Sequence, residues 1–206
     1  MTLGLFGGTF DPPHIGHLIV AQDAAEALAL ETVIFMPAGQ PPHKRGQTIS
    51  PAALRLRMTR LATADAPGCV VDDREIRRAG PSWTVDTLAE LAAERPGIEL
   101  VLLVGTDQYE SLETWKDADR IRSLSRVAVL DREGGGAVKA PRDVRVRVTR
   151  IDVSGSDIRE RVAAGRPIRH LVAPAVEAVI RSHGLYAGAG DSEGSRDDRN
   201  DIAGAG

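Results

Sequence analysis

Residues 3–17 read LGLFGGTFDPPHIGH, an apolar run followed by paired glycines, paired prolines and two histidines. The apolar run is typical of a buried strand, and the next stretch, residues 17–30, has the spacing of an amphipathic helix. The face of that helix turned to the core is expected to carry Leu18, Ala21, Ala25 and Leu28. Glycines allow a tight turn between strand and helix. The stretch therefore predicts the first strand–turn–helix unit of an α/β fold.

Short apolar runs alternate with amphipathic stretches along most of the chain. After the first strand, further strands are expected at residues 32–38, 69–71, 99–105, 126–130 and 144–153. After the first helix, further helices are expected at residues 51–64, 84–97, 117–124, 154–165 and 173–184. This order predicts a Rossmann-like α/β fold, an open and mainly parallel sheet with helices on both faces. Such folds bind ligands at the carboxyl ends of their strands.

Composition limits the class of protein. A chain of 206 residues, 42% of them hydrophobic, can bury a sizeable core. We expect one domain over residues 1–186 and a disordered tail over residues 187–206, which are small, polar or charged. A net charge of −3 gives no sign of a nucleic-acid partner, and no apolar stretch approaches a membrane span. With one cysteine and no leader pattern, the chain is expected in the cytoplasm.

The turn after the first strand has the ingredients of a phosphate site. It lacks both the GxGxxG pattern and the GK[ST] ending of a P-loop. Gly7 and Gly8 nevertheless let backbone approach a ligand, and the helix that starts near Gly16 points free N–H groups toward it. His14 and His17 lie about one turn apart, so their rings can share a face. A local cap and an exposed loop histidine are the plainer explanation, but the pair behind a Gly-Gly turn favours a polyphosphate cradle.

A second anion site is expected near the other end of the chain, in the stretch VSGSDIRERV at residues 153–162. Ser154 and Ser156 lie at a helix start, and Arg159 lies one turn inside that helix. An ordinary serine cap with a solvated arginine is the alternative. Together with the first turn, this segment can grip a triphosphate from the opposite side.

Three stretches between these sites bear on the substrate: residues 40–46, 81–88 and 105–121. The stretch QPPHKRG at residues 40–46 follows a strand and carries His43 and Lys44, which suggests a phosphate clamp rather than a charged surface loop. Asp107 follows the most apolar strand and is placed to bind a ribose hydroxyl or a metal. Trp115, on the next loop, can stack on a planar ring, and its polar neighbours argue against a core position.

The stretch PSWTVDTL at residues 81–88 predicts a helix start. Ser82 or Thr84 would cap this helix and leave backbone N–H groups free to receive a carboxylate. The alternative is a cap with no ligand.

These stretches also resemble a known family. GGTFDPPHIGH resembles the GTFDxxHxGH signature of the HxGH nucleotidyltransferase superfamily, and VSGSDIR is similar to its ISSTxIR element, with Gly155 in place of a serine. PSWTVDTL resembles PSYTxDTL, and residues 105–121 resemble a G-[TSA]-D segment followed by LxxWxxxxxI/L. With PPHK, the set resembles bacterial nicotinate-nucleotide adenylyltransferases up to about residue 186. Arg132, in DREGGG, stands where that family usually has Arg-Pro-Gly.

The resemblance implies transfer of the adenylyl group of ATP to nicotinate mononucleotide, giving nicotinate adenine dinucleotide and pyrophosphate in NAD biosynthesis. It implies direct in-line attack, with Mg²⁺ and without a covalent enzyme intermediate. The implied catalytic residues are His14, His17 and Arg159. The implied ATP-binding residues are Gly7, Gly8, Thr9, Phe10, His14, His17, Gly105, Asp107, Ser154, Ser156 and Arg159. The implied mononucleotide-binding residues are Asp11, His43, Lys44, Thr84, Trp115 and Arg132, and no residue is assigned to a resident metal.

Two other functions stay open. Pantetheine-phosphate adenylyltransferases share the first motif, but the PSWTVDTL and GTD…W stretches do not fit them. A non-catalytic nucleotide-binding module on this fold is disfavoured because His14 and His17 are both present. The sequence leaves open whether the chain forms a homo-oligomer.

Overall fold

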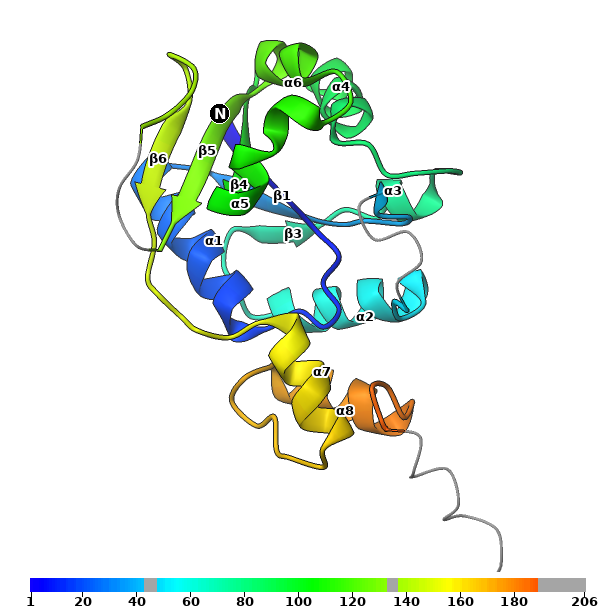
Figure 1. Cartoon of the computed structure of the whole chain (residues 1–206). Helices are drawn as coiled ribbons and strands as arrows, with labels where there is room; N and C mark the ends of the chain where they lie inside the picture. Colours follow the sequence, from blue (N-terminus) through cyan, green and yellow to red (C-terminus); the bar gives the residue numbers. More distant parts are fainter. Residues whose placement is uncertain (43–47, 133–136, 189–206) are drawn as a thin grey trace, which may run out of the picture.

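The chain folds around a six-stranded sheet, seen in a computed structural model that describes residues 1–42, 48–132 and 137–188 (Figure 1). The strands are β1 (Thr2–Gly8), β2 (Thr32–Pro37), β3 (Cys69–Val71), β4 (Glu99–Gly105), β5 (Arg126–Asp131) and β6 (Val144–Arg147). Their order is β3-β2-β1-β4-β5-β6, and all neighbouring pairs are parallel. The order reverses at β1, which therefore ends at the topological switch point. The predicted Rossmann-like fold is confirmed.

The helices follow the predicted alternation. The longer ones are α1 (Ile15–Leu28), α2 (Ala52–Thr63), α4 (Thr84–Glu94), α6 (Ala118–Leu124), α7 (Gly155–Ala163) and α8 (Pro174–Ser182). The short ones are α3 (Arg74–Arg77), α5 (Thr106–Glu110) and a 3₁₀ turn, η2 (Leu112–Thr114). Gly165 and Gly184 follow α7 and α8 with positive φ, the left-handed conformation that ends a helix.

One strand is shorter than expected. The prediction for residues 144–153 was wrong beyond Arg147, where β6 ends. The Val148 N–H still donates to the Asp131 carbonyl, but the Thr149 N–H donates to the Asp23 carboxylate of α1. The chain leaves the sheet edge there because the Thr149 N–H is bonded to the Asp23 carboxylate and not to a neighbouring strand.

Alternate strand residues point to opposite faces of the sheet and build two apolar clusters. Leu102 faces Leu88 and its neighbours on α4, whereas Leu103 lies in the cluster with Val20 of α1. Figure 1 shows α4 and α6 on one side of the sheet and α1 on the other. A third cluster joins α2 to α7 and α8.

No helix among the described residues is long and apolar enough to cross a membrane. Of the expected tail, residues 189–206 lie outside the described residues.

Candidate functional site

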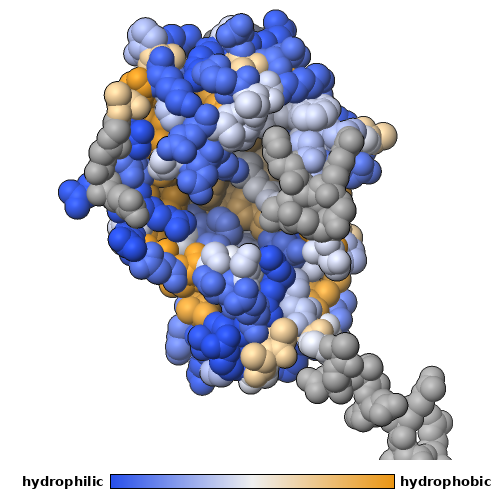
Figure 2. Space-filling view, in the orientation of Figure 1, coloured by the Kyte–Doolittle hydropathy of each residue, from blue (hydrophilic) through white to orange (hydrophobic). Residues whose placement is uncertain are grey.

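Two cavities open at the carboxyl ends of β1 and β4, one on each face of the sheet. The first, here called the tryptophan cavity, has a volume of 190 Å³ and includes Gly8, Thr9, Trp83, Thr84, Gln108, Trp115 and Lys116 in its lining. The second, the Asp107 cavity, has a volume of 690 Å³ and includes Phe6, Gly105, Asp107, Gln108 and Arg132 in its lining. Gln108 lines both. Figure 2 shows a hollow at the centre of this side of the molecule, with hydrophobic residues in its depth.

The two histidines of the first motif stack on each other at the start of α1. Their ring centroids lie 3.7 Å apart. The backbone N–H of His14, the residue that caps α1, donates to His17 Nδ1 at 3.1 Å. Because Nδ1 is the acceptor, this hydrogen bond assigns the proton of a neutral His17 ring to Nε2. The structure therefore confirms that the rings share a face, and it makes Nε2–H of His17 a donor.

Burial keeps both rings uncharged. Desolvation, with a smaller contribution from the charge of Arg132, lowers the pKa of His14 to about 4. Desolvation and the neighbouring His14 lower the pKa of His17 well below its usual value. His14 Nδ1 is buried and has no hydrogen-bond partner within the described ranges. At neutral pH the pair is an uncharged set of ring nitrogens, and a nearby polyanion would raise both pKa values.

Gly16 makes this arrangement possible. A Cβ at position 16 would lie 3.1 Å from His14 Nδ1. Any other residue there would push against the ring that stacks on His17. The glycine in HIGH thus leaves room for the close stacking of the histidine pair.

The start of α7 packs against the first motif. Arg159 Nη1 donates to the Asp11 backbone carbonyl at 2.7 Å, and Nη2 donates to Ser156 Oγ at 3.1 Å. Ser154 caps α7: its Oγ accepts from the Asp157 N–H and donates to the Asp157 carboxylate. The structure brings the two predicted anion motifs together, but the Ser154 hydroxyl is used in the helix cap.

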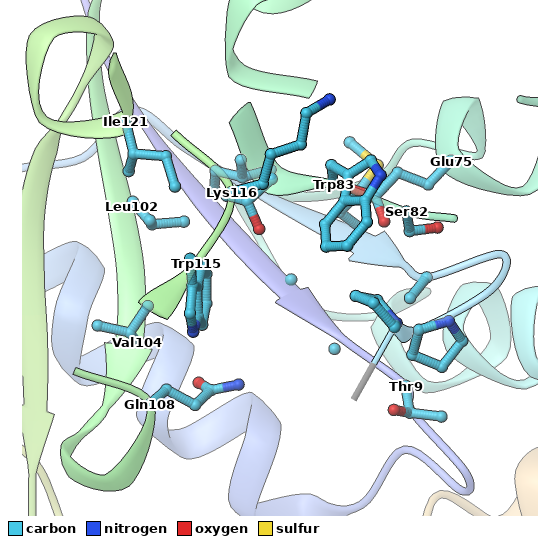
Figure 3. Close-up of a pocket in the computed structure, with 18 of the residues that line it drawn as sticks. Thr9, Glu75, Ser82, Trp83, Leu102, Val104, Gln108, Trp115, Lys116 and Ile121 are labelled. Carbon is cyan, nitrogen blue, oxygen red and sulfur yellow. The ribbon is translucent and has the colours of Figure 1, made fainter. Parts of the chain in front are cut away.

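The tryptophan cavity has an aromatic lining and one cation among its described residues. Figure 3 shows the Trp83 and Trp115 rings facing a common open space, with Lys116 above it. Lys116 Nζ lies 3.2 Å from the Asp86 carboxylate and 5.8 Å from the centroid of the Trp83 ring. Asp86 belongs to the first turn of α4, so Lys116 offsets a negative charge at this helix start.

The expected serine or threonine cap of α4 was wrong. Trp83 is the residue before the helix, and no side chain caps it. Ser82 Oγ instead accepts from the backbone N–H groups of Gly39 and Gln40, at 2.9 and 3.3 Å, because it faces the segment after β2. The start of α4 therefore has no side-chain acceptor. The Asp86 N–H donates to the Trp83 carbonyl, which leaves the N–H groups of Thr84 and Val85 for a ligand.

Comparisons with known proteins agree with one another. A sequence model of the cytidylyltransferase-like family matches residues 5–161. A protein of Thermomicrobium roseum named "Probable nicotinate-nucleotide adenylyltransferase" is 46% identical over 194 residues, which cover 89% of this chain and 91% of that protein. A protein of the same name from Thermus thermophilus is 42% identical and covers 90% of this chain and 100% of its own length. The chain belongs to the nicotinate-nucleotide adenylyltransferase family.

Membership of this family makes the chain a nucleotidyltransferase. A solved structure of Plasmodium falciparum nicotinic acid mononucleotide adenylyltransferase complexed with NaAD superposes with a TM-score of 0.75 at 14% identity, covering 90% of this chain and 97% of the other. The complex of that protein with APC gives a TM-score of 0.72. At this identity the superposition supports the fold.

The residues that suggested the nicotinate-nucleotide adenylyltransferase family fall into distinct groups in space. Gly7, Gly8, Thr9, Thr84 and Trp115 line the tryptophan cavity. Gly105 and Asp107 line the other cavity. Arg132, expected beside the mononucleotide, also lines the Asp107 cavity, among residues expected to bind ATP. His43 and Lys44 lie outside the described residues.

Two residues predicted to bind ligands, Phe10 and Asp11, are buried and contact other parts of the protein. The Phe10 side chain is 2% exposed and packs on the His17 ring, with centroids 5.0 Å apart. The Asp11 carboxylate accepts from the Ser50 N–H at 3.1 Å and from the Tyr186 hydroxyl. Both residues therefore hold the first motif in shape, a role that their sequence positions did not reveal.

Sequence reasoning did not predict three residues that contact the first motif or line the tryptophan cavity. They are Arg55, Lys116 and Tyr186. Arg55 looks like an ordinary charge on an amphipathic helix, and Tyr186 lies beyond the last motif. Only Lys116 carried a signal, because it follows Trp115 directly.

No group of three or more His, Cys, Asp or Glu side chains that could hold a metal lies among residues 1–42, 48–132 and 137–188. Asp107 is an exposed carboxylate on the Asp107 cavity. Mg²⁺ commonly takes one or two carboxylates together with substrate phosphates and water. This donor set fits an ion that arrives with a nucleotide.

Proposed function

We propose that the chain transfers the adenylyl group of ATP to nicotinate mononucleotide, releasing pyrophosphate and nicotinate adenine dinucleotide, in the biosynthesis of NAD. The observation that carries the proposal is a pair of cavities that share Gln108 at the carboxyl ends of β1 and β4, with a stacked histidine pair at the start of α1. Phe6, which lines the Asp107 cavity, has its ring centroid 6.0 Å from that of His17. A transferase that joins two nucleotides needs two binding sites and a set of donors between them. The names of the relatives support the same reaction.

The tryptophan cavity is the proposed site of the pyridine ring. Two indole rings and a volume of 190 Å³ suit a flat heterocycle. The carboxylate of the nicotinate ring would accept hydrogen bonds from the uncapped N–H groups of α4, close to Lys116. His43 and Lys44 keep their proposed role as a clamp for the phosphate of the mononucleotide.

The Asp107 cavity is the proposed site of the ATP nucleoside. Asp107 can accept from ribose hydroxyls, and Arg132 adds positive charge beside it. The triphosphate would lie at the start of α1, between His14, His17 and the α7 segment held by Arg159.

The reaction needs positioning more than acid–base chemistry. The phosphate of the mononucleotide has a second pKa of about 6, so it is largely dianionic at neutral pH and attacks without a general base. One of its oxygens forms a bond to the α-phosphorus of ATP, and the bond from that phosphorus to the bridging oxygen of pyrophosphate breaks. His17 Nε2–H would donate to the α-phosphate, in an orientation fixed by the hydrogen bond at Nδ1. Mg²⁺, when bound, would offset the negative charge of the phosphates.

The test is pyrophosphate release from ATP and Mg²⁺ with one acceptor at a time. We expect release with nicotinate mononucleotide and much less with nicotinamide mononucleotide or phosphopantetheine. Release with phosphopantetheine alone would show a pantetheine-phosphate adenylyltransferase. ATP binding without release from any acceptor would show a nucleotide-binding module.

A further inference from the structure

Arg55 of α2 is one of the largest fully buried side chains among the described residues. It is 2% exposed. Its guanidinium donates to three backbone carbonyls: Nε to Ser50 at 3.0 Å, Nη1 to Thr9 at 2.8 Å and Nη2 to Gly39 at 3.1 Å. No ion pair involves Arg55 in the part of the chain that the structure describes. A buried cation without a salt bridge is costly, so its hydrogen bonds must compensate.

The three carbonyls belong to three separate segments. Thr9 follows β1, Gly39 follows β2, and Ser50 precedes α2. Thr9 lines the tryptophan cavity, and so do Ala38 and Pro41 on either side of the Gly39–Gln40 pair. One planar guanidinium thus joins the turn of the first motif to the segment that forms another part of the same wall.

Gly39 is held from its other sides as well. A Cβ at this position would lie 2.3 Å from the Glu75 carbonyl oxygen, so the segment sits tightly on the backbone of α3. The Gly39 N–H donates to Ser82 Oγ on the approach to Trp83. The position of the wall relative to the two indole rings is therefore set by Arg55 on one side and Ser82 on the other.

We propose that Arg55 is a positioning residue for the acceptor nucleotide: it fixes the wall of the tryptophan cavity formed by Thr9, Ala38, Pro41 and Pro42. The inference rests on the proposed function, because the mononucleotide is the ligand that this wall would contact. A lysine at position 55 keeps the charge but offers one nitrogen, which cannot reach three carbonyls in the geometry of the guanidinium fork.

The test compares Arg55→Lys with Met58→Ala. Met58 is on the same helix and is fully buried in the α2–α7–α8 cluster, so its truncation lowers stability without touching the wall. Binding of nicotinate mononucleotide is followed by tryptophan fluorescence, because both tryptophans of the chain line this cavity. Pyrophosphate release gives KM for each substrate.

For Arg55→Lys we expect Kd and KM for nicotinate mononucleotide to rise about tenfold or more, since misplacement by about 1 Å can cost up to 10²-fold. KM for ATP should change by less than about twofold, because the start of α1 is held by bonds that Arg55 does not make: the Ile15 N–H donates to the Leu171 carbonyl and the His17 N–H to the His14 carbonyl. Met58→Ala should lower the melting temperature and leave both KM values unchanged.

Equal effects of Arg55→Lys on both substrates, or no change in Kd for the mononucleotide, would overturn the inference. If Arg55→Lys does not fold, Ser82→Ala takes its place, and an unchanged KM for the mononucleotide in that variant would overturn it equally. A wild-type protein that neither binds nicotinate mononucleotide nor releases pyrophosphate would instead overturn the proposed function.

Discussion

The role of His17 depends on which ring nitrogen carries its proton. A hydrogen bond from the N–H of His14 occupies Nδ1, so Nε2 is left to donate. Burial and the ring of His14 both disfavour the charged form. The ring is therefore a fixed dipole donor, and in the proposed reaction it would meet the developing charge without having to reorient.

Replacement of His17 by alanine should lower kcat by about 10²–10³, the usual cost of losing one such donor, with a much smaller change in KM. Pyrophosphate release measures both constants. His183→Ala is the matched control, because His183 is an exposed histidine at the end of α8. A His17→Ala enzyme with wild-type turnover would show that His17 has no part in the transition state.

The pKa of His14 gives stability a sharp dependence on pH. Its folded-state value of about 4 lies below the ordinary value of 6.5, so the unfolded chain takes up the proton first as the pH falls. Stability should be full above pH 6.5 and fall by about 2–3 kcal/mol toward pH 4 on account of this residue.

Urea unfolding of the wild type and of His14→Gln between pH 7.5 and 4.5 checks this value. Carboxylates titrate in both proteins, so the difference between the two curves reports His14 together with its effect on the pKa of His17. The His14→Gln curve should be flatter by about 2 kcal/mol over this range. Parallel curves would mean that His14 is protonated as easily in the folded protein as in the unfolded one.

At the residue scale, sequence reasoning succeeded where a residue acts through its own motif. Trp115 and Asp107 line the two cavities at the carboxyl ends of the strands, and His14 and His17 stack at the start of α1. It did not reveal the structural contact of Asp11, because the partner of that carboxylate, Tyr186, lies 175 residues away. A single sequence carries no signal for such a distant pair.

The elements position the site through their ends. Strands β1 and β4 stop beside each other, and α1, α4 and α7 begin within reach of that edge (Figure 1). The start of α4 has no side-chain cap, and Lys116 offsets the charge of Asp86 in its first turn. The helix start can therefore receive a carboxylate that Asp86 would otherwise repel.

Replacement of Lys116 by methionine should lower kcat/KM for nicotinate mononucleotide about three- to tenfold, because an exposed cation near a carboxylate contributes modestly. The value for nicotinamide mononucleotide, which has no carboxylate, should stay the same. Lys139→Met is the matched control: Lys139 also lies over an aromatic ring, that of Tyr109, but outside the cavity lining. Equal losses for both mononucleotides would remove Lys116 from acceptor selection.

Helix α1 shows what periodicity can and cannot predict. The helix is present as expected, and Ala21 of its predicted face is buried. Its other buried side chains are Val20 and Ala24, whereas Leu18, Ala25 and Leu28 are only partly buried. Small residues let the helix lie close to the sheet, and the leucines reach around its margins. Apolar spacing identified the helix, and side-chain size decided which stripe faces the strands.

At the scale of the whole molecule, three apolar clusters hold the site together. Two cover the faces of the sheet, and the third joins α2 to α7 and α8. Helix α2 connects the cavity wall to the third cluster: Arg55 contacts the wall, and Met58 packs in the cluster. The parallel sheet and the positions of the longer helices follow from the alternation in the sequence, but the docking of α7 and α8 depends on side-chain shape that no pattern records.

Tyr186 is the last link of the C-terminal region to the first motif. Tyr186→Phe removes the hydroxyl that donates to Asp11, and a hydrogen bond to a charged group contributes about 1.5–3 kcal/mol. We expect a loss of stability of that order by urea unfolding. Ser182→Ala, which removes an exposed hydroxyl of α8, should cost less than about 0.5 kcal/mol. A Tyr186→Phe protein as stable as the wild type would mean that the hydrogen bond from Tyr186 to Asp11 makes no net contribution to stability.

The contacts of Asp11 also determine when the site can form during synthesis. Its carbonyl is held by a residue 148 positions later, and its carboxylate by one 175 positions later. A chain growing on the ribosome can form the first strand and helix early, but the turn between them lacks these partners until Tyr186 has emerged. The first motif is encoded by residues 7–17, and its last described contact forms only when Tyr186 has been made.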